Sequence, residues 1–218
     1  AHSDLPYVSI SNTYRKLNYP EDLNYAATIY NGIDIDAHNL ERVERADYLL
    51  FLGRVCPDKG TAEAIELAQE LALPLKIAGK IDPADREYFN HSIKPHLSSK
   101  IEYIGEVNFS EKLKLYAGAI ALLYPVKFEE PFGLVMAEAL AGGVPIMALR
   151  RGSVSELVSD GETGILGDSV KELLARFGEV AAIKSQKCTE RARSLFSKER
   201  MLKEYTKLYE RIKNGNNN

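Results

Sequence analysis

Residues 119–143 read AIALLYPVKFEEPFGLVMAEALAGG, and this stretch decides the fold because it joins a short apolar strand to a helix. Its first seven residues form a continuous apolar run, which is typical of a parallel strand buried on both faces. The Pro-Phe-Gly sequence further on suits a helix start, where free N–H groups and the helix dipole favour an anion. Two carboxylates, Glu130 and Glu138, lie eight residues apart, one just before this helix and one inside it.

The same order of strand and helix continues on both sides of this stretch. Apolar runs that end in glycine or at a turn predict buried strands at residues 48–53, 74–79, 101–105, 119–125, 144–149 and 163–166. Helical patterns lie between them, at 61–72, 83–97, 111–118 and after Pro131. This alternation predicts an α/β fold with a doubly wound, Rossmann-like parallel sheet. Ligands bind such sheets at the carboxyl ends of the strands.

Several serines stand where helix caps are expected. Ser110 is expected to cap the helix at 111–118, and two capping-box patterns pair Ser153 with Glu156 and Ser169 with Glu172. The first part of the chain has no such rhythm, and we expect only two short strands there, YVSIS (7–11) and AATIY (26–30). The residues from 197 to 213 form an amphipathic helical pattern.

The composition is that of an ordinary soluble globular protein, with 218 residues, 45% hydrophobic, 27% charged and a net charge of −3. Its two cysteines lie far apart and its four histidines show no zinc spacing, which predicts a cytoplasmic protein without a metal site. Residues 184–213 hold ten Lys and Arg against four Asp and Glu, a net +6, so the rest carries −9. This acidic remainder argues against a nucleic-acid partner.

The loop after the expected strand 48–53 reads GRVCPDKG and carries two cations, Arg54 and Lys59. A planar guanidinium and a mobile ammonium suit a pyrophosphate, and Gly53 and Gly60 let the backbone come close to a ligand. The loop matches neither the Walker pattern nor the dinucleotide GxGxxG pattern. By itself it fits a solvated loop as well as a ligand site.

The spacing of Glu130 and Glu138 gives the stronger signal. Eight residues of helix rise about 12 Å, which is the span from the sugar of a sugar diphosphate nucleotide to its ribose. With the pyrophosphate at the helix start beside Gly133, Glu130 would meet the sugar hydroxyls and Glu138 the ribose hydroxyls. The alternative is that Glu138 satisfies a local polar contact and Glu130 is a surface charge.

Together these stretches resemble a known family. GRVCPDKG, EPFGLVMAE, ALAGGVPIMA, RRGSVSE and DGETGIL occur in the order found in the carboxy-terminal, donor-binding domain of family 4 retaining glycosyltransferases, which have the GT-B fold. The resemblance runs from about residue 27 to 209. It implies a remnant of a preceding domain and a linker at 1–36, a Rossmann-like donor-binding domain at 37–196, and a crossing helix with a tail at 197–218.

The resemblance also implies roles by position. Glu130, Arg54 and Lys59 would be catalytic, since the two cations stabilise the departing diphosphate and Glu130 holds the donor sugar. The donor-binding residues would be Gly53, Arg54, Lys59, Tyr103, Gly105, Val107, Glu130, Phe132, Gly133, Leu134, Val135 and Glu138. Gly152 and Ser153 are further candidates for the sugar pocket, and a role elsewhere is equally open for them.

The expected activity is retaining transfer of a hexosyl group from a nucleoside-diphosphate sugar, with uridine as the expected base and no cofactor. The family's acceptor-binding domain has no counterpart in the sequence, so we expect it in the same gene or in a separate chain, and weak or no transfer by this chain alone. Membrane contact is expected only through that half, and self-association through the domain surface it would cover. The alternatives are a non-catalytic nucleotide-sugar-binding or regulatory module and another GT-B enzyme, such as a sugar-nucleotide epimerase.

Overall fold

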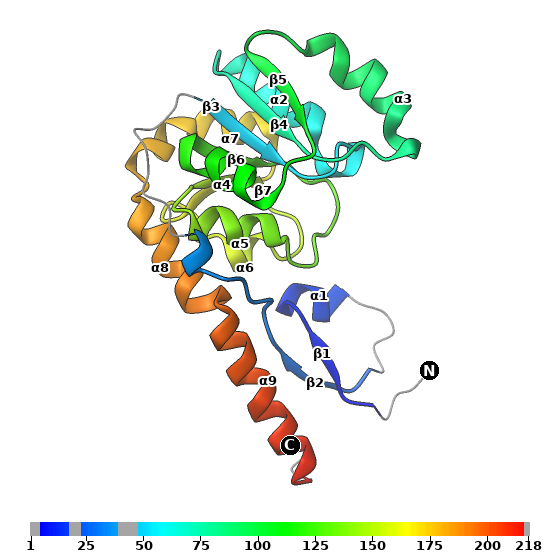
Figure 1. The fold of residues 1–218 in the computed structure, drawn as a ribbon, viewed down its shortest axis with the longest axis vertical. Coiled ribbons are helices and arrows are strands. Elements are labelled where there is room, and N and C mark those ends of the chain that lie inside the picture. The colour runs from blue at the N-terminus through cyan, green and yellow to red at the C-terminus, as the bar shows by residue number, and fades with distance from the viewer. Residues whose placement is uncertain (1–4, 18–22, 39–47, 216–218) are drawn as a thin grey trace.

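The computed structural model of the protein describes residues 5–17, 23–38 and 48–215, and its main body is a six-stranded parallel sheet (Figure 1). The strands are β3 (Tyr48–Leu52), β4 (Leu75–Ala78), β5 (Ile101–Gly105), β6 (Ala119–Tyr124), β7 (Ile146–Leu149) and β8 (Gly164–Gly167). They lie in the order β5-β4-β3-β6-β7-β8. The α/β fold and all six predicted strands are confirmed.

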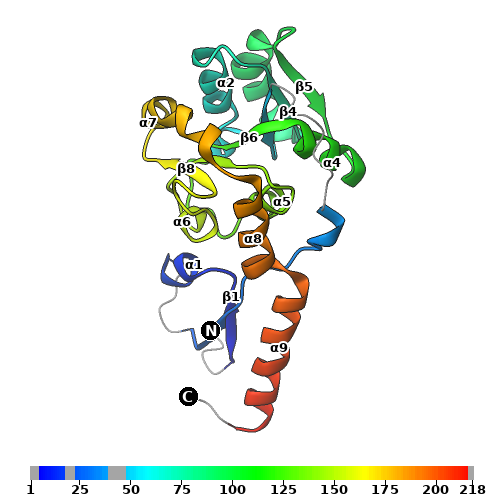
Figure 2. The same cartoon turned by 90° about the vertical axis from the view of Figure 1, so that its left-hand side faces the viewer.

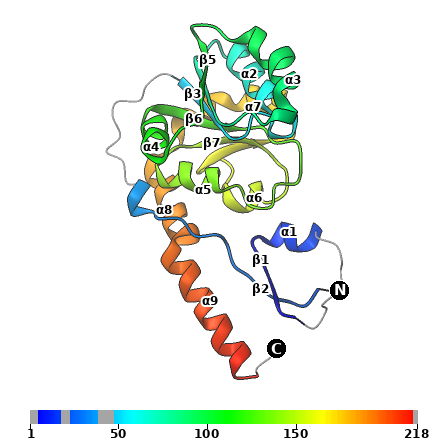
Figure 3. The ribbon, with the colours of Figure 1, turned by 45° about the vertical axis from the view of Figure 1, so that its right-hand side comes forward.

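Helices cover both faces of this sheet (Figure 3). One face carries α2 (Thr61–Glu70), α3 (Arg86–Tyr88) and α7 (Val170–Arg176), and α2 contacts α7. The other face carries α4 (Phe109–Gly118), α5 (Leu134–Ala141), α6 (Val154–Leu157) and α8 (Ser185–Phe196), and α5 packs on α8. Two covered faces explain why all five residues of β3 are buried.

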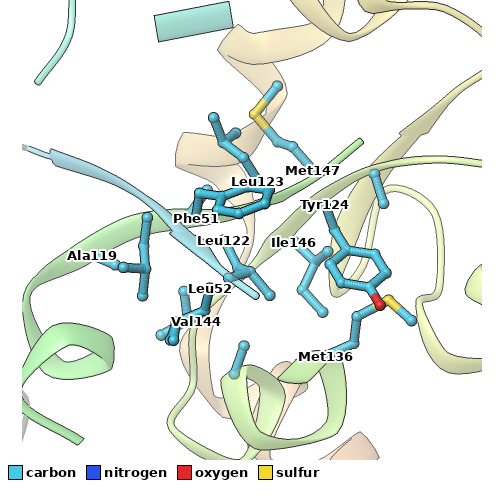
Figure 4. Packing of buried hydrophobic residues seen from close by; sticks show 14 of the residues in the cluster. Phe51, Leu52, Ala119, Leu122, Leu123, Tyr124, Met136, Val144, Ile146 and Met147 are labelled. Atoms are coloured by element: carbon cyan, nitrogen blue, oxygen red, sulfur yellow. The ribbon is translucent and has the colours of Figure 1, made fainter. Parts of the chain in front are cut away.

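The core is formed by alternate strand residues that point to opposite faces (Figure 4). Leu122 and Leu123 are consecutive in β6 and both fully buried, with Leu122 on the side of Met136 in α5 and Leu123 on the side of Phe51 and Met147. Side chains of this apolar run therefore alternate between the two faces of the sheet, in register with the neighbouring strands β3 and β7.

The predicted helix at 83–97 is wrong in detail. The structure has a 3₁₀ turn at Pro83–Asp85, the single α turn of α3, a π turn at Phe89–Ile93 and a 3₁₀ turn at Lys94–His96. Pro95 has no backbone N–H to donate to an α-helical hydrogen bond. The hydrogen-bonding pattern of the backbone therefore changes from one turn type to another before this residue.

Two of the predicted caps also need correction. The cap of α4 is Asn108, whose side chain accepts from the N–H of Glu111 while the Glu111 carboxylate accepts from the N–H of Asn108, so Ser110 lies inside the helix. Ser169 does cap α7. The Glu172 carboxylate, however, binds the N–H of Asp168 instead of closing the second half of the box.

The main sheet has a topological switch between its two central strands, β3 and β6. The chain after β3 turns toward β4, and the chain after β6 turns toward β7, so the loops beyond their carboxyl ends diverge over the sheet edge. These loops nevertheless touch, because the N–H of Lys127 donates to the carbonyl of Asp58 at 2.9 Å. The predicted ligand loops are therefore neighbours at the switch point.

A small second unit lies beside α9 (Lys198–Lys213). It consists of β1 (Tyr7–Ser9), α1 (Asn12–Leu17) and β2 (Tyr25–Thr28), with the two strands parallel. Figure 2 shows β1 and α1 beside α9. Both expected strands are confirmed, whereas α1 was not predicted. Arg211 of α9 donates to the carbonyl of Ala26 at 2.8 Å and ties the helix to this unit.

The linker after β2 crosses the junction between α8 and α9. Ile33 donates its N–H to the carbonyl of Phe196 and accepts from the N–H of Lys198. Gly32 permits the crossing, since a Cβ there would lie 2.7 Å from the Cα of Lys198. Within the described ranges, no helix combines the length and apolar character that crossing a membrane requires.

Candidate functional site

The loop after β3 is fixed against the loop after β6 by a glycine. Residues Pro57–Lys59 form a 3₁₀ turn that ends at Gly60, whose φ is +77°. A Cβ on Gly60 would stand 2.0 Å from the carbonyl oxygen of Pro125, so only glycine fits. The contact sets the position of Lys59 relative to the chain beyond β6.

Lys59 and Glu130 form the centre of the site. The Lys59 ammonium lies 2.6 Å from Oε2 of Glu130 and 4.6 Å from the centroid of the Phe128 ring. The side chains of Glu130 and Lys59 are only 9% and 24% exposed. A pair this shielded from water interacts strongly, since solvent screens it poorly. The structure therefore unites two of the three predicted catalytic residues.

Tyr124, at the end of β6, was missed from sequence. Its hydroxyl donates to the same Oε2 of Glu130 at 2.5 Å. Burial and the nearby charge of Glu130 raise the pKa of Tyr124 far above its usual range, so the hydroxyl stays protonated and can donate. The signal was a polar tip closing an otherwise apolar strand six residues before Glu130.

If Glu130 binds the donor as the sequence predicts, replacing Tyr124 by phenylalanine is expected to weaken that binding at least about tenfold. The change removes one hydrogen bond to a charged acceptor, typically worth about 1.5–3 kcal/mol, while keeping the ring in the core. Dissociation constants from calorimetry would measure the effect. An unchanged affinity would show that Lys59 alone suffices to hold Glu130.

The start of α5 is the end of the site at which the sequence predicted an anion. Gly133 has a φ of +79° and precedes α5, and a Cβ there would lie 2.7 Å from Cε of Met136 and 2.9 Å from the Tyr124 hydroxyl. The first N–H groups of a helix have no acceptor within it, which leaves those of Leu134 and Val135 for a ligand. Phe132 is buried.

The Phe132 side chain packs away from the helix start. Its ring contacts the rings of Tyr30 and Phe196, with centroids 6.0 and 5.7 Å away. Only the backbone of Phe132 is thus left for the donor contact predicted for it. The aromatic cluster instead joins the loop after β6 to the linker and to the end of α8.

Glu138 lies one turn into α5 and is held by two side chains of α4. Because α5 begins at Leu134, residues 130–133 are not helical, and the predicted span of eight helical residues between Glu130 and Glu138 is wrong. Its Oε1 is 2.6 Å from the Lys112 ammonium and its Oε2 accepts from the Tyr116 hydroxyl at 3.1 Å. Burial and the charge of Glu138 raise the pKa of Tyr116, so this hydroxyl also remains a donor. Neither partner was predicted, because both come from another helix.

Arg54, the third predicted catalytic residue, lies apart from this centre in the described structure. Its side chain is 50% exposed and pairs with Asp82 at 3.4 Å, and Lys80 lies 2.6 Å from the same carboxylate. Hydrogen bonding to Cys56 first, and then to Asp82, raises the pKa of Arg54. A diphosphate would have to draw this flexible side chain away from Asp82 to engage it.

The carboxyl ends of β3, β4 and β5 form a close row of glycines. Gly53 donates its N–H to the carbonyl of Ala78, and Gly79 donates to that of Gly105. A Cβ on Gly79 would stand 1.8 Å from the carbonyl oxygen of Gly53. Because these three residues have no side chains, the backbone itself forms the surface at this edge of the sheet.

The predicted base-pocket residues lie along β5 and just after it. The Tyr103 hydroxyl donates to the carbonyl of Gly79 at 2.9 Å, and its ring lies 5.1 Å from that of Phe89. Gly105 has a φ of +92°, and Val107 is half-buried. The apolar side chain of Ile104 is exposed beside them. Base contacts by Tyr103, Gly105 and Val107 stay a prediction.

The segment before α6 supports the backbone of Glu130. The N–H of Ser153 donates to the carbonyl of Glu130 at 2.8 Å, and the Ser153 hydroxyl donates to that of Phe132 at 3.1 Å. A Cβ on Gly152 would stand 2.4 Å from the nitrogen of Glu130. Ser153 therefore stabilises the loop after β6 and makes no side-chain capping bond to α6.

Glu156, the other half of that predicted capping box, binds α1 instead. Its carboxylate accepts from the N–H groups of Asn12, at 2.8 Å, and Thr13, and from the Tyr30 hydroxyl at 2.8 Å. Burial acts to raise the pKa of Glu156, but these hydrogen bonds outweigh it and hold the pKa below its usual value. Burial and this carboxylate raise the pKa of Tyr30 to about 12.

Glu156→Gln is expected to destabilise the protein at neutral pH by about 1 kcal/mol, as for a lost helix cap. Because folding lowers the pKa of Glu156, its contribution is complete above the ordinary glutamate pKa and disappears as the pH falls through the lower folded value. Urea unfolding from pH 7 down to pH 3 should therefore show a difference between wild type and variant that shrinks in acid. A constant difference would contradict this role.

Among the residues that the structure describes, no three Asp, Glu, His or Cys side chains are grouped closely enough to hold a metal ion. Lys59 and the start of α5 lie beside the switch point, while Arg54 is paired with Asp82. The sheet order β5-β4-β3-β6-β7-β8, with a cation, a carboxylate and a helix start beside its switch point, defines a Rossmann-like domain.

Comparison with known proteins identifies the family. Residues 33–194 match the sequence family described as glycosyl transferases group 1. The chain belongs to this family.

Two curated relatives illustrate the match. An uncharacterised glycosyltransferase of Methanocaldococcus jannaschii is 30% identical over 156 residues, covering 71% of this chain and 43% of that protein. Glycogen synthase of Mycobacterium tuberculosis is 32% identical over 146 residues, covering 63% of this chain and 34% of the enzyme. The chain thus spans less than half the length of either relative.

Solved structures agree with the fold. AviGT4, a glycosyltransferase involved in avilamycin A biosynthesis, superposes with a TM-score of 0.79 at 28% identity, over 95% of this chain and 63% of that one. Anabaena HepE, solved with UDP and glucose, gives a TM-score of 0.81 at 18% identity, over 94% of this chain and 62% of that one. The sheet and its helices therefore match GT-B glycosyltransferase structures.

Proposed function

We propose that this chain is the donor-binding half of a family 4 retaining glycosyltransferase. It binds a nucleoside-diphosphate sugar, with UDP as the expected nucleotide, and presents the sugar for hexosyl transfer with retention of configuration. The acceptor is held by a second domain outside these 218 residues, in the same gene or in a separate chain. The protein works in the cytoplasm.

The observation that carries the proposal is the convergence of Lys59 and Glu130. They come from loops 71 residues apart and meet at 2.6 Å beside the first turn of α5. A phosphate at that helix start would find free N–H groups and a cation, and a sugar next to it would find a carboxylate. Group membership makes this ligand chemically reasonable.

The charges explain how the site could serve transfer. When the bond between the anomeric carbon and the diphosphate breaks, the electron pair moves to the diphosphate oxygen, and Lys59 and the α5 dipole stabilise that charge. Glu130 accepts hydrogen bonds from sugar hydroxyls and keeps the anomeric carbon facing the acceptor. In the structure the Lys59 ammonium is paired with the Glu130 carboxylate, so a bound diphosphate would share the ammonium with Glu130.

A thermal-shift series with UDP, GDP, ADP and their glucose conjugates tests the proposal. A nucleotide present at 100 times its Kd should stabilise the fold by about 2.7 kcal/mol. The shift should disappear in Lys59→Ala and remain in Lys203→Ala, an exposed lysine of α9. No shift with any of the six compounds would contradict the proposal.

The proposed need for a separate acceptor-binding domain can be tested on this chain alone. We expect this chain alone to show little transfer or donor hydrolysis, because nothing in the proposed site positions an acceptor. Release of UDP from UDP-glucose would measure this. Robust turnover by the chain alone would contradict the need for a separate acceptor domain.

A further inference from the structure

Lys112 stands where helix electrostatics do not favour it. It lies in the first turns of α4, just after the Asn108 cap, at the positive end of the helix dipole. A cation there is slightly unfavourable unless something else holds it. Its ammonium lies 2.6 Å from Glu138 on α5, and both side chains are shielded, 21% and 14% exposed.

Lys112 and Tyr116 bind different oxygens of the same carboxylate. Lys112 donates to Oε1 of Glu138, and the Tyr116 hydroxyl donates to Oε2 at 3.1 Å, with the Val135 carbonyl as a second, more distant acceptor at 3.3 Å. Two donors on two oxygens fix the rotation of the carboxylate plane, because turning it would break both contacts. Each oxygen has about two lone-pair sites, so one remains on each for a ligand.

The remaining acceptor site on each oxygen of Glu138 could bind one hydroxyl of a vicinal diol. Two hydroxyl donors on adjacent carbons can bind the two oxygens of one carboxylate only if that carboxylate keeps its orientation. Without Lys112, Glu138 would be a shielded charge without a counter-ion and would lose one of the two contacts that orient it.

We propose that Lys112 is a positioning and specificity-determining residue that holds Glu138 for recognition of the ribose 2′,3′-diol. This inference rests on the proposed donor site. It assigns to Lys112 the selection of ribonucleotides over 2′-deoxyribonucleotides. A direct contact between Lys112 and the nucleotide is not required.

The test compares calorimetric Kd values for whichever of UDP, GDP and ADP binds most tightly and for its 2′-deoxy counterpart. Wild type should prefer the ribonucleotide by at least about tenfold, the value of one hydrogen bond to a charged group. Lys112→Met should reduce that preference at least about fivefold, mainly by weakening the ribonucleotide. Lys112→Arg should restore it, and Lys114→Met, an exposed lysine two positions along, should leave it unchanged.

The outcomes distinguish failure of the role of Lys112 from failure of the proposed donor site. An unchanged preference in Lys112→Met, or tighter binding of the ribonucleotide, would overturn the role of Lys112 while leaving the donor site intact. Tighter binding would mean that Lys112 competes with ribose for Glu138. No nucleotide binding by wild type would overturn the donor site and this inference together. Melting curves of the free variants exclude misfolding as the cause.

Discussion

On the proposed function, Glu130→Ala is expected to slow sugar transfer roughly a hundred- to a thousandfold in a protein that includes the proposed acceptor-binding domain. The carboxylate is nearly buried and accepts from Tyr124 and Lys59 through one oxygen, Oε2. Removing it frees the Lys59 ammonium and leaves the sugar without its acceptor group. The rate constant for transfer, measured at saturating donor, would show the loss.

Glu130→Gln is the matched variant, because it keeps the shape and one acceptor for the Tyr124 hydroxyl but removes the charge. We expect an intermediate loss, since the ion pair with Lys59 is gone while the side chain stays in place. Transfer within threefold of wild type in Glu130→Ala would exclude a catalytic role. A rise in KM with unchanged kcat would restrict Glu130 to binding the ground state.

The fold could be predicted because its signals are local. Five of the six strands of the main sheet are short runs that are almost wholly buried, whereas the edge strand β5 alternates buried or half-buried residues with exposed ones. Glycines at the strand ends marked the loops. The prediction of a single α-helix at 83–97 was wrong because proline fits into short helical turns but has no N–H for a regular series of α-helical hydrogen bonds.

The candidate site could be predicted only in part, because half of each contact lies far away in sequence. The chain order placed Lys59 and Glu130 on neighbouring loops, and the structure brings them together. It did not reveal that Lys112 reaches Glu138 from 26 residues away. Nor did it reveal that Glu156 binds α1 across 144 residues. Local spacing instead suggested a capping box for Glu156.

Gly60→Ala is expected to destabilise the protein by about 3–5 kcal/mol. The left-handed backbone contributes about 1–2 kcal/mol of that cost for any residue with a Cβ. The rest comes from the contact with the Pro125 carbonyl, which an added Cβ would approach to 2.0 Å, so one of the two loops must move. Free energies of unfolding from urea titration would measure the effect.

Gly161→Ala is the matched control, because Gly161 has the same φ of +77° but nothing lies within 4 Å of its added Cβ. It should cost only the backbone share, about 1–2 kcal/mol, and leave nucleotide affinity unchanged. Gly60→Ala should also weaken nucleotide binding, because displacement of the loop separates Lys59 from Glu130. Equal destabilisation by the two variants would mean that the loop after β3 is free to shift. The convergence of Lys59 and Glu130 would then depend on their own ion pair instead of on the packing of Gly60 against Pro125.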